Sequence, residues 1–166
     1  MIFSKNRFLL IVSFLFLTFS AFAQMPSSEE LPKVFLIGEY ENQYEQELAN
    51  YQETMLSVCR NDMEKAFGLW MSFSQELEAF AKRINYDLSG VKAWMHVLFS
   101  PNGKVDYLAY HLKPDSRNVD TVELTAVINS FIEFYQLPLT ASTNYSIYTG
   151  VQFPTYYLLP NGENGN

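Results

Sequence analysis

The sequence has 166 residues, of which 48% are hydrophobic and 17% are charged, and its formal net charge at pH 7 is −7. This apolar composition excludes an intrinsically disordered chain, and the acidic balance argues against a surface that binds nucleic acid or anionic membranes. After the first 23 residues, no apolar run approaches the length of a membrane span. The composition therefore predicts one globular domain with neither a membrane span nor a nucleic-acid partner.

The first 23 residues have the layout of a secretory signal peptide. Lys5 and Arg7 precede the apolar run of residues 8–19, and an Ala-x-Ala sequence follows at residues 21–23. A basic start, a short apolar core and small residues at the exit predict cleavage after Ala23. The leader contains two basic residues and no acidic one, so its removal takes the net charge from −7 to −9. We therefore expect a periplasmic or secreted protein.

The mature chain is predicted to form a single α+β domain over residues 24–160, followed by a disordered tail at residues 161–166. Cys59 is the single cysteine, so the chain cannot form an intramolecular disulfide. We expect Cys59 to be a small buried hydrophobe, because no histidine lies near it in the sequence. Residues 24–33 are polar and contain two prolines, which predicts a loose lead into an ordered part that begins near Val34.

Residues 34–88 carry apolar side chains at helical spacing, in two series. Asn61 followed by Glu64 has the spacing of a capping box, so we expect the helix to break at residues 60–62. The alternative is one long helix, because the two series are nearly in phase. The first series is Tyr40, Tyr44, Leu48, Tyr51, Met55 and Val58, and the second is Met63, Phe67, Trp70, Phe73, Leu77, Phe80 and Ile84.

After Gly90 the pattern changes to that of a β-hairpin. Residues 91–99 and 105–112 are rich in β-branched and aromatic side chains, and the turn sequence SPNGK lies between them. If Ser100 faces Lys104, then Trp94 lies opposite Tyr110 and His96 opposite Leu108 on one face. Met95 then lies opposite Ala109, and Ala93 opposite His111, on the other face. This register predicts that the two histidines point to opposite faces of the hairpin.

One helix and one strand complete the predicted β-β-α-β half of the domain, residues 91–159. Asp120 and Glu123 form a second capping-box pair, which opens a helix over residues 122–135 with the stripe Leu124, Val127, Phe131 and Phe134. Residues 145–159 are aromatic and rich in β-formers, but Gly150 and Pro154 interrupt them, so we expect an edge strand or an irregular pair of strands. The predicted fold is α+β: a small, mainly antiparallel three-stranded sheet with the helical half, residues 34–88, packed on it.

The loop before the last predicted helix is a candidate anion site. Lys113, Ser116 and Arg117 precede the helix, and free amide groups at a helix start bind carboxylates or phosphates when a guanidinium is added. The alternative, which we favour, is structural. Asp115, Ser116 and Asn118 are ordinary turn and cap residues, and Arg117 would pair with Asp115 or Asp120.

The tyrosines of the last segment are the second candidate site. Tyr145, Tyr148 and Tyr156 could stack on a sugar or a peptide, because tyrosine combines a broad contact area with a polar tip. Packing in the core or at the sheet edge is the alternative explanation.

No catalytic or metal-binding pattern emerges from the sequence. With the histidines on opposite faces and no paired His or Cys spacing, a metal site is not expected, and nothing indicates a cofactor. The sequence contains no nucleophile elbow, phosphate-binding glycine loop or recognisable pair of catalytic carboxylates. An enzyme is therefore not indicated.

Residues 93–153 resemble the C-terminal module of TonB-type periplasmic proteins. The likeness lies in the hairpin sequence FSPNGKVDYLAYHL, the helix after SRNVDTVEL and the strand near VQFP. The chain is also similar to small exported proteins of Bacteroidota that have no assigned function. In the TonB family an edge strand captures a peptide of an outer-membrane transporter, so the resemblance implies binding by strand addition. The sequence lacks the family's proline-rich span and uncleaved anchor and carries helices instead, which argues against energy transduction.

Two functional hypotheses follow from the sequence. The first is an exported, non-catalytic module that recognises a peptide or an envelope protein through the strand of residues 145–159 and its tyrosines. The second is a small-anion binder, or an enzyme, that works at Lys113, Ser116 and Arg117. An open sheet edge with exposed aromatic side chains would favour the first, and a pocket where Arg117 meets helix amides would favour the second.

Overall fold

The computed structural model describes residues 30–156. The predicted leader with its cleavage after Ala23, residues 24–29 and the predicted tail at residues 161–166 lie outside the described residues. All described elements belong to the part of the chain that begins at Leu31. Within residues 30–156 we find no helix that is both long and apolar enough to cross a membrane.

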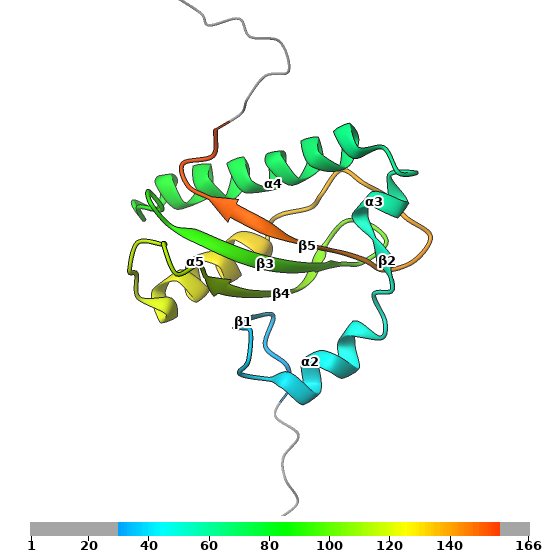
Figure 1. The fold of residues 1–166 in the computed structure, drawn as a ribbon, viewed down its shortest axis with the longest axis horizontal. Coiled ribbons are helices and arrows are strands. Elements are labelled where there is room, and N and C mark those ends of the chain that lie inside the picture. The colour runs from blue at the N-terminus through cyan, green and yellow to red at the C-terminus, as the bar shows by residue number, and fades with distance from the viewer. Residues whose placement is uncertain (1–29, 157–166) are drawn as a thin grey trace, which may run out of the picture. The chain divides into compact units, whose positions relative to one another are not determined.

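The described part is an α+β fold built on a five-stranded mixed sheet (Figure 1). The strand order is β1-β4-β3-β5-β2. β3 pairs antiparallel with β4 and with β5, whereas β1 pairs parallel with β4 and β2 pairs parallel with β5. The strands are β1 (Val34–Leu36), β2 (Glu53–Thr54), β3 (Lys92–Phe99), β4 (Val105–Leu112) and β5 (Tyr145–Gln152).

The predicted three-stranded sheet is therefore wrong in detail, although the α+β class is confirmed. β3, β4 and β5 are the three strands that the sequence predicted, and the two short parallel strands β1 and β2 were missed. A strand of two or three residues leaves too short an alternation to be detected, and only its pairing with a distant strand defines it.

Four helices lie in the described residues: α2 (Glu41–Leu48), α3 (Met55–Val58), α4 (Met63–Arg83) and α5 (Thr121–Ile132). The predicted break near residues 60–62 is confirmed, since Arg60 and Asn61 both adopt positive φ. The cap of α4 is Asp62 rather than Asn61, and its carboxylate accepts a 3.0 Å hydrogen bond from the amide of Lys65.

The continuous helix expected over residues 40–58 is wrong. The chain leaves α2 after Leu48, becomes extended at Glu53 and Thr54, and forms a new helical turn, α3. Tyr51 is buried, and its hydroxyl donates to Asp106 of β4 at 2.8 Å. This contact fixes the chain between the two helices, so packing overrides the helical spacing of the apolar residues.

The core lies between α4, α5 and one face of the sheet. Buried side chains of β3 on this face, Met95 and Phe99 among them, belong to one cluster with buried side chains of both helices. At its centre the ring of Phe73 from α4 lies 5.5 Å from Phe131 of α5 and 6.3 Å from Phe99, measured between ring centroids. Phe134, predicted to belong to the core stripe of α5, is 83% exposed, because α5 ends at Ile132 and the stripe turns to the solvent.

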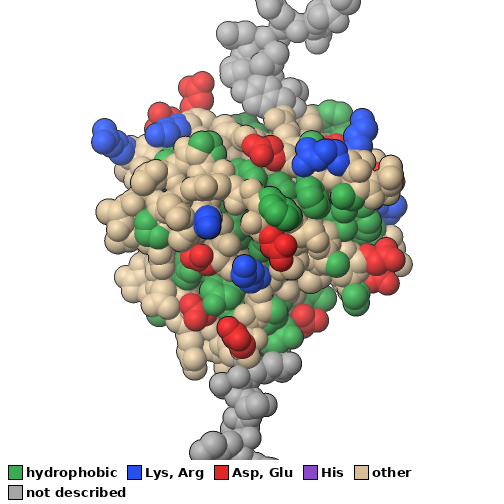
Figure 2. Space-filling model, turned by 180° about the vertical axis from the view of Figure 1, so that it is seen from behind, with side chains coloured by type: hydrophobic (Ala, Val, Ile, Leu, Met, Phe, Trp, Pro, Cys, Tyr) green, Lys and Arg blue, Asp and Glu red, His purple; other side chains and the backbone are tan. Residues whose placement is uncertain are grey.

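The opposite face of the sheet is only partly covered. Phe35 of β1 and Ala109 of β4 are buried there beneath Tyr40 and Tyr44, which flank or belong to α2. Trp94 and Tyr148, on the same face farther along, are 38% and 55% exposed. On the side of the molecule seen in Figure 2, acidic and basic side chains are interspersed with hydrophobic ones.

The hairpin forms where the sequence predicted it, but its register differs by one residue. Phe99 pairs with Val105, whereas Leu98 pairs with Tyr107, so Asp106 is an extra residue in β4. Trp94 consequently pairs with His111 and Met95 with Tyr110. The predicted pairs of Trp94 with Tyr110, His96 with Leu108, Met95 with Ala109 and Ala93 with His111 are wrong, because a one-residue bulge moves every later side chain of β4 to the other face.

Candidate functional site

The edge of the sheet beyond β5 is open over most of its length. On one side β3 pairs with all of β5, from Tyr145 to Gln152. On the other side β2 pairs only with Tyr145 and Ser146. β2 is short because Thr54 also caps α3, where its hydroxyl accepts a 3.1 Å hydrogen bond from the amide of Ser57. Within residues 30–156 no strand continues along β5 after this point.

The outward-facing backbone groups of β5 follow from its pairing with β3. The amide of Phe153 donates to the carbonyl of Val91, at 2.9 Å. In an antiparallel ladder alternate residues bond to the same neighbour, so the odd-numbered residues of β5 bond to β3. Tyr148, Gly150 and Gln152 therefore point their N–H and C=O groups away from β3. No partner for these groups lies within the described residues.

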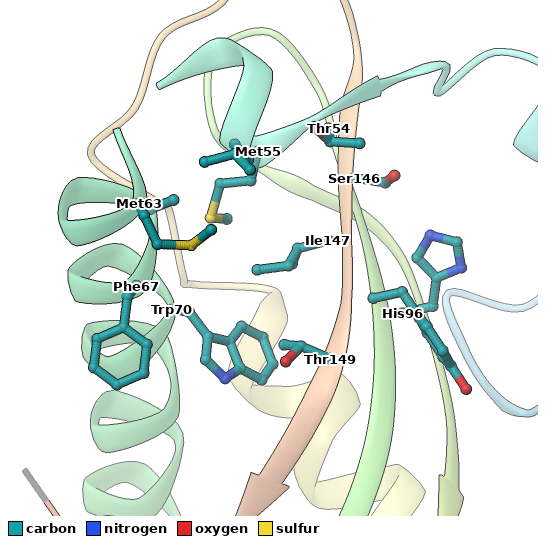
Figure 3. A pocket seen from close by; sticks show the side chains of 12 residues that line it. Thr54, Met55, Met63, Phe67, Trp70, His96, Ser146, Ile147 and Thr149 are labelled. Atoms are coloured by element: carbon teal, nitrogen blue, oxygen red, sulfur yellow. The ribbon is translucent and has the colours of Figure 1, made fainter. Parts of the chain in front are cut away.

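A groove runs along this open edge, between β5 and α4, and its larger section is mainly apolar. We call it the β5 groove. Its larger section has a volume of about 440 Å³, and its smaller one about 270 Å³, with Trp70 of α4 lining both. Figure 3 shows the larger section, with Met63, Phe67 and Trp70 on α4 and Ile147 and Thr149 on β5. The smaller section is lined by Trp70, Met71, Ser74, Gly150, Val151, Gln152, Pro154, Thr155 and Tyr156.

Two large apolar side chains on the α4 wall of the β5 groove are exposed to solvent. Met63 is 66% exposed and Phe67 56%, although both belong to the same apolar series as the buried Trp70 and Phe73. The buried face of α4 is carried instead by Trp70, Phe73 and Leu77. Such side chains beside an unpaired strand form a surface that favours contact with another chain.

On the other face of β5, three rings form a row, which we call the aromatic row: Trp94, Tyr148 and His96. The Tyr148 ring stacks on Trp94 with 5.8 Å between centroids, and it meets His96 edge-on at 5.4 Å. Beyond the row, the hydroxyl of Tyr44 hydrogen-bonds with Nδ1 of His96 at 2.5 Å. Burial lowers the pKa of His96 and raises that of Tyr44 to about 12, with a further contribution from Tyr148.

The structure separates the three predicted tyrosines. Tyr148 is exposed at the open edge, and Tyr156, 71% exposed, lines the far end of the β5 groove. Tyr145 is fully buried, stacks on Phe99 at 5.2 Å and donates a 3.4 Å hydrogen bond to the carbonyl of Leu139. Tyr145 therefore does not contribute to the exposed surface at the open edge, because Tyr145 and Tyr148 lie three residues apart in a strand and point to opposite faces.

The predicted anion loop does not form a converging site. Arg117 turns to Asp87, donating to its carbonyl and lying 3.7 Å from its carboxylate. Ser116 accepts a 3.0 Å hydrogen bond from the amide of Lys92. Lys113 lies elsewhere, with its ammonium 4.4 Å from the ring centre of Trp94.

The amides at the start of α5 already have an acceptor. The Asp120 carboxylate accepts from the amides of Val122 and Glu123, at 2.8 and 3.2 Å. The expected pairing of Arg117 with Asp115 or Asp120 is wrong, because Asp120 caps the helix and Asp115 pairs with Lys92 at 2.7 Å.

The bulge at Asp106 also overturns the reason given against a two-histidine site. With Trp94 opposite His111, both histidines point to the same face of the sheet as the aromatic row. Even so, no group of three or more His, Cys, Asp or Glu side chains gathers to hold a metal ion in the described part of the chain. Cys59 is buried as predicted, and burial raises the pKa of its thiol.

Sequence reasoning missed Met63, Phe67, Trp94 and Gly150 as site residues. The two α4 side chains share the period of the core stripe, so spacing could not distinguish a groove wall from the core. Gly150 did give a signal, because a glycine inside a strand often marks a close approach of another group. Here that group is the Lys113 ammonium, which would lie 2.6 Å from a Cβ at position 150.

Comparison of the chain with protein-family models, with curated proteins and with solved structures gave no significant match.

Proposed function

We propose that this chain is an exported, non-catalytic module that binds an extended peptide, or an extended segment of a partner protein, as an added strand at β5. The observation that carries the proposal is the short pairing of β2, which leaves the outward backbone groups of Tyr148, Gly150 and Gln152 open beside the β5 groove. An added strand would bond to these groups, and the groove would take some of its side chains.

The proposed mode has separate sources of affinity and selectivity. Backbone hydrogen bonds to β5 would bind any extended segment, whatever its sequence. Alternate side chains of that segment would point into the β5 groove, toward Trp70 and Phe67, and would bury apolar surface there. The remaining side chains would lie on the face of Tyr148. The resemblance of residues 93–153 to the TonB module, whose edge strand captures a peptide, is in keeping with this mode.

The matched variants Gly150→Pro and Gly150→Ala test the proposal. Both add a Cβ against the Lys113 ammonium, but only proline removes the outward N–H. The probe is a displayed library of random heptapeptides. We expect peptides selected on the wild-type protein to bind Gly150→Ala and to lose binding to Gly150→Pro. Equal binding to both variants would overturn the proposal.

Hydrogen exchange on the wild-type protein provides a test that does not depend on how the proline variant folds. A bound peptide should slow exchange of the amides of Tyr148, Gly150 and Gln152 together. The amides of Ile147 and Thr149 face β3 and should change little. Unchanged exchange at the three outward amides with a peptide bound would contradict strand addition.

We further propose that export precedes function, through removal of the leader after Ala23. Expression of the full chain with its leader in a Gram-negative host should give an envelope or secreted protein whose mass corresponds to a chain that begins at Gln24. A protein that keeps its first 23 residues would contradict this localisation.

A further inference from the structure

Lys113 places a positive charge at the open edge of β5. Lys113 directly follows β4, and its side chain lies over Trp94, with Nζ 4.4 Å from the centre of that ring. A Cβ at position 150 would lie 2.6 Å from Nζ, so the ammonium lies against the backbone of Gly150 on the aromatic-row face. Gly150 is one of the residues whose backbone groups point outward.

This ammonium has no carboxylate in contact within the described residues. The two ion pairs found there join Lys92 to Asp115 and Arg117 to Asp87. The nearby carboxylate of Asp115 pairs with Lys92 instead, at 2.7 Å from Nζ. This hydrogen bond is the main cause of the lowered pKa of Asp115, and the charge of Lys113 contributes a smaller part. The close contact of Lys113 is the ring of Trp94, which attracts a cation more weakly than a carboxylate does. Lys113 therefore retains the capacity to bind an anion at the edge.

The alternation of side chains in a strand relates this charge to the β5 groove. A residue added opposite Gly150 would point its side chain to the aromatic-row face, where the ammonium lies. Each of its sequence neighbours would point to the other face, where Thr149, Val151 and Trp70 line the groove. Two adjacent residues of one bound peptide would therefore contact the Lys113 ammonium and the β5 groove, respectively.

We propose that the ligand is an extended peptide in which one Asp or Glu stands directly beside a large apolar residue. The carboxylate binds Lys113 and the apolar side chain enters the β5 groove beside Trp70. This inference rests on the proposed function and adds the chemical class of the peptide. A single acid fits better than an acidic run, because the chain carries a net charge of −7 with its leader and −9 without it, and so repels further negative charge.

The test selects random heptapeptides on the wild-type protein, on Lys113→Met and on Lys113→Arg. Methionine keeps an unbranched apolar stem over Trp94 and removes the charge, and arginine keeps the charge. We expect an acid next to a large apolar residue to be enriched on the wild type and on Lys113→Arg, and the acid preference to disappear on Lys113→Met. Far-UV circular dichroism and urea unfolding establish that the variants are folded.

One selected peptide and its isostere, with Gln for Glu or Asn for Asp, then give the size of the effect. The amide isostere should bind the wild-type protein about three- to tenfold more weakly at low salt, and the difference should shrink as salt is added. On Lys113→Met the two peptides should bind equally.

The possible outcomes distinguish a failure of the role of Lys113 from a failure of strand addition at β5. Apolar peptides without an acid preference, blocked by Gly150→Pro but not by Gly150→Ala, would overturn the role of Lys113 and leave strand addition standing. An acid preference that persists on Lys113→Met would also overturn that role. Peptides that bind both Gly150 variants equally would overturn strand addition itself.

Discussion

The hydroxyl of Tyr51 donates a 2.8 Å hydrogen bond to the carboxylate of Asp106, the residue that bulges from β4. Tyr51 belongs to the segment that joins α2 to β2, so this contact links the helical first half of the chain to the hairpin. Burial and the neighbouring carboxylate both raise the pKa of Tyr51, which keeps its hydroxyl protonated and able to donate.

Removing this hydroxyl should destabilise the fold. We expect Tyr51→Phe to lower the free energy of unfolding by about 1–2 kcal/mol, because a hydrogen bond to a charged acceptor is lost at a buried ring. Asp106→Asn keeps an acceptor in place and serves as the milder control. Urea denaturation followed by circular dichroism measures both. A Tyr51→Phe midpoint equal to that of the wild type would show that the bulge is held by other contacts.

His96 should make stability depend on pH below about 6.5. Burial lowers its pKa in the folded state below the ordinary value of 6.5, so the unfolded chain binds a proton more readily. The stability from a neutral His96 is complete above pH 6.5 and is lost as the pH falls below this value toward the lowered pKa of the folded state. Carboxyls with lowered pKa, such as that of Asp87, act at lower pH.

Two variants test whether His96 causes this pH dependence of stability. Unfolding free energies of wild type and His96→Gln are compared from pH 7.5 to 5, and the fall with acid should be smaller in the variant. Tyr44→Phe removes the hydroxyl bound to Nδ1 but keeps the aromatic ring at this position of α2, and it should keep the wild-type slope. If His96→Gln retains the full slope, another group is responsible.

Replacing Tyr135 with phenylalanine should stabilise the protein. Its hydroxyl is buried without a hydrogen-bond partner in the described residues, and its ring packs on Phe131 at 4.9 Å and on Phe73 at 5.1 Å. Tyr135→Phe keeps these ring contacts and removes the unpaired polar group, so we expect a gain of about 1 kcal/mol in the free energy of unfolding. Thermal or urea unfolding gives the sign, and a clear loss would indicate a bonded hydroxyl.

Arg117 should behave as a structural residue rather than an anion ligand. Its guanidinium contacts the carbonyl and carboxylate of Asp87, both on the surface. We expect Arg117→Ala to cause only the small loss of stability typical of exposed ion pairs. Millimolar phosphate or sulfate should shift the melting temperatures of wild type and variant equally. An anion that stabilises the wild type alone would restore the anion-site hypothesis.

Local sequence patterns predicted the individual helices and strands of this fold better than the register and contacts between them. The hairpin strands, α4, α5 and the aromatic segment that contains β5 all follow from periodicity and caps. The bulge does not, because a single extra residue is stabilised by a side chain 55 positions away, Tyr51 against Asp106. Tertiary contacts of this kind override local spacing.

The candidate site was predictable in part, for the same reason. The last segment forms a strand, β5, but not the outermost one, because β2 pairs with its first two residues; beyond Ser146 its outer side is unpaired in the described residues. Met63 and Phe67 belong to the predicted apolar series of the second helix but are exposed, because helical spacing indicates which side of α4 they occupy and not whether another element covers that side. Strand alternation alone could have separated Tyr145 from Tyr148.

The cap of α3 determines how far the sheet extends. Thr54 is the last residue of β2 and also the N-cap of α3, with reciprocal hydrogen bonds to Ser57 at 3.1 Å. A third residue of β2 would have to come from the first turn of that helix, including Met55, which is buried in the core. The start of α3 thus limits the length of β2, and the length of β2 determines how much of β5 stays unpaired. Substitutions at Thr54 and Ser57 would therefore change the length of the unpaired edge without changing β5.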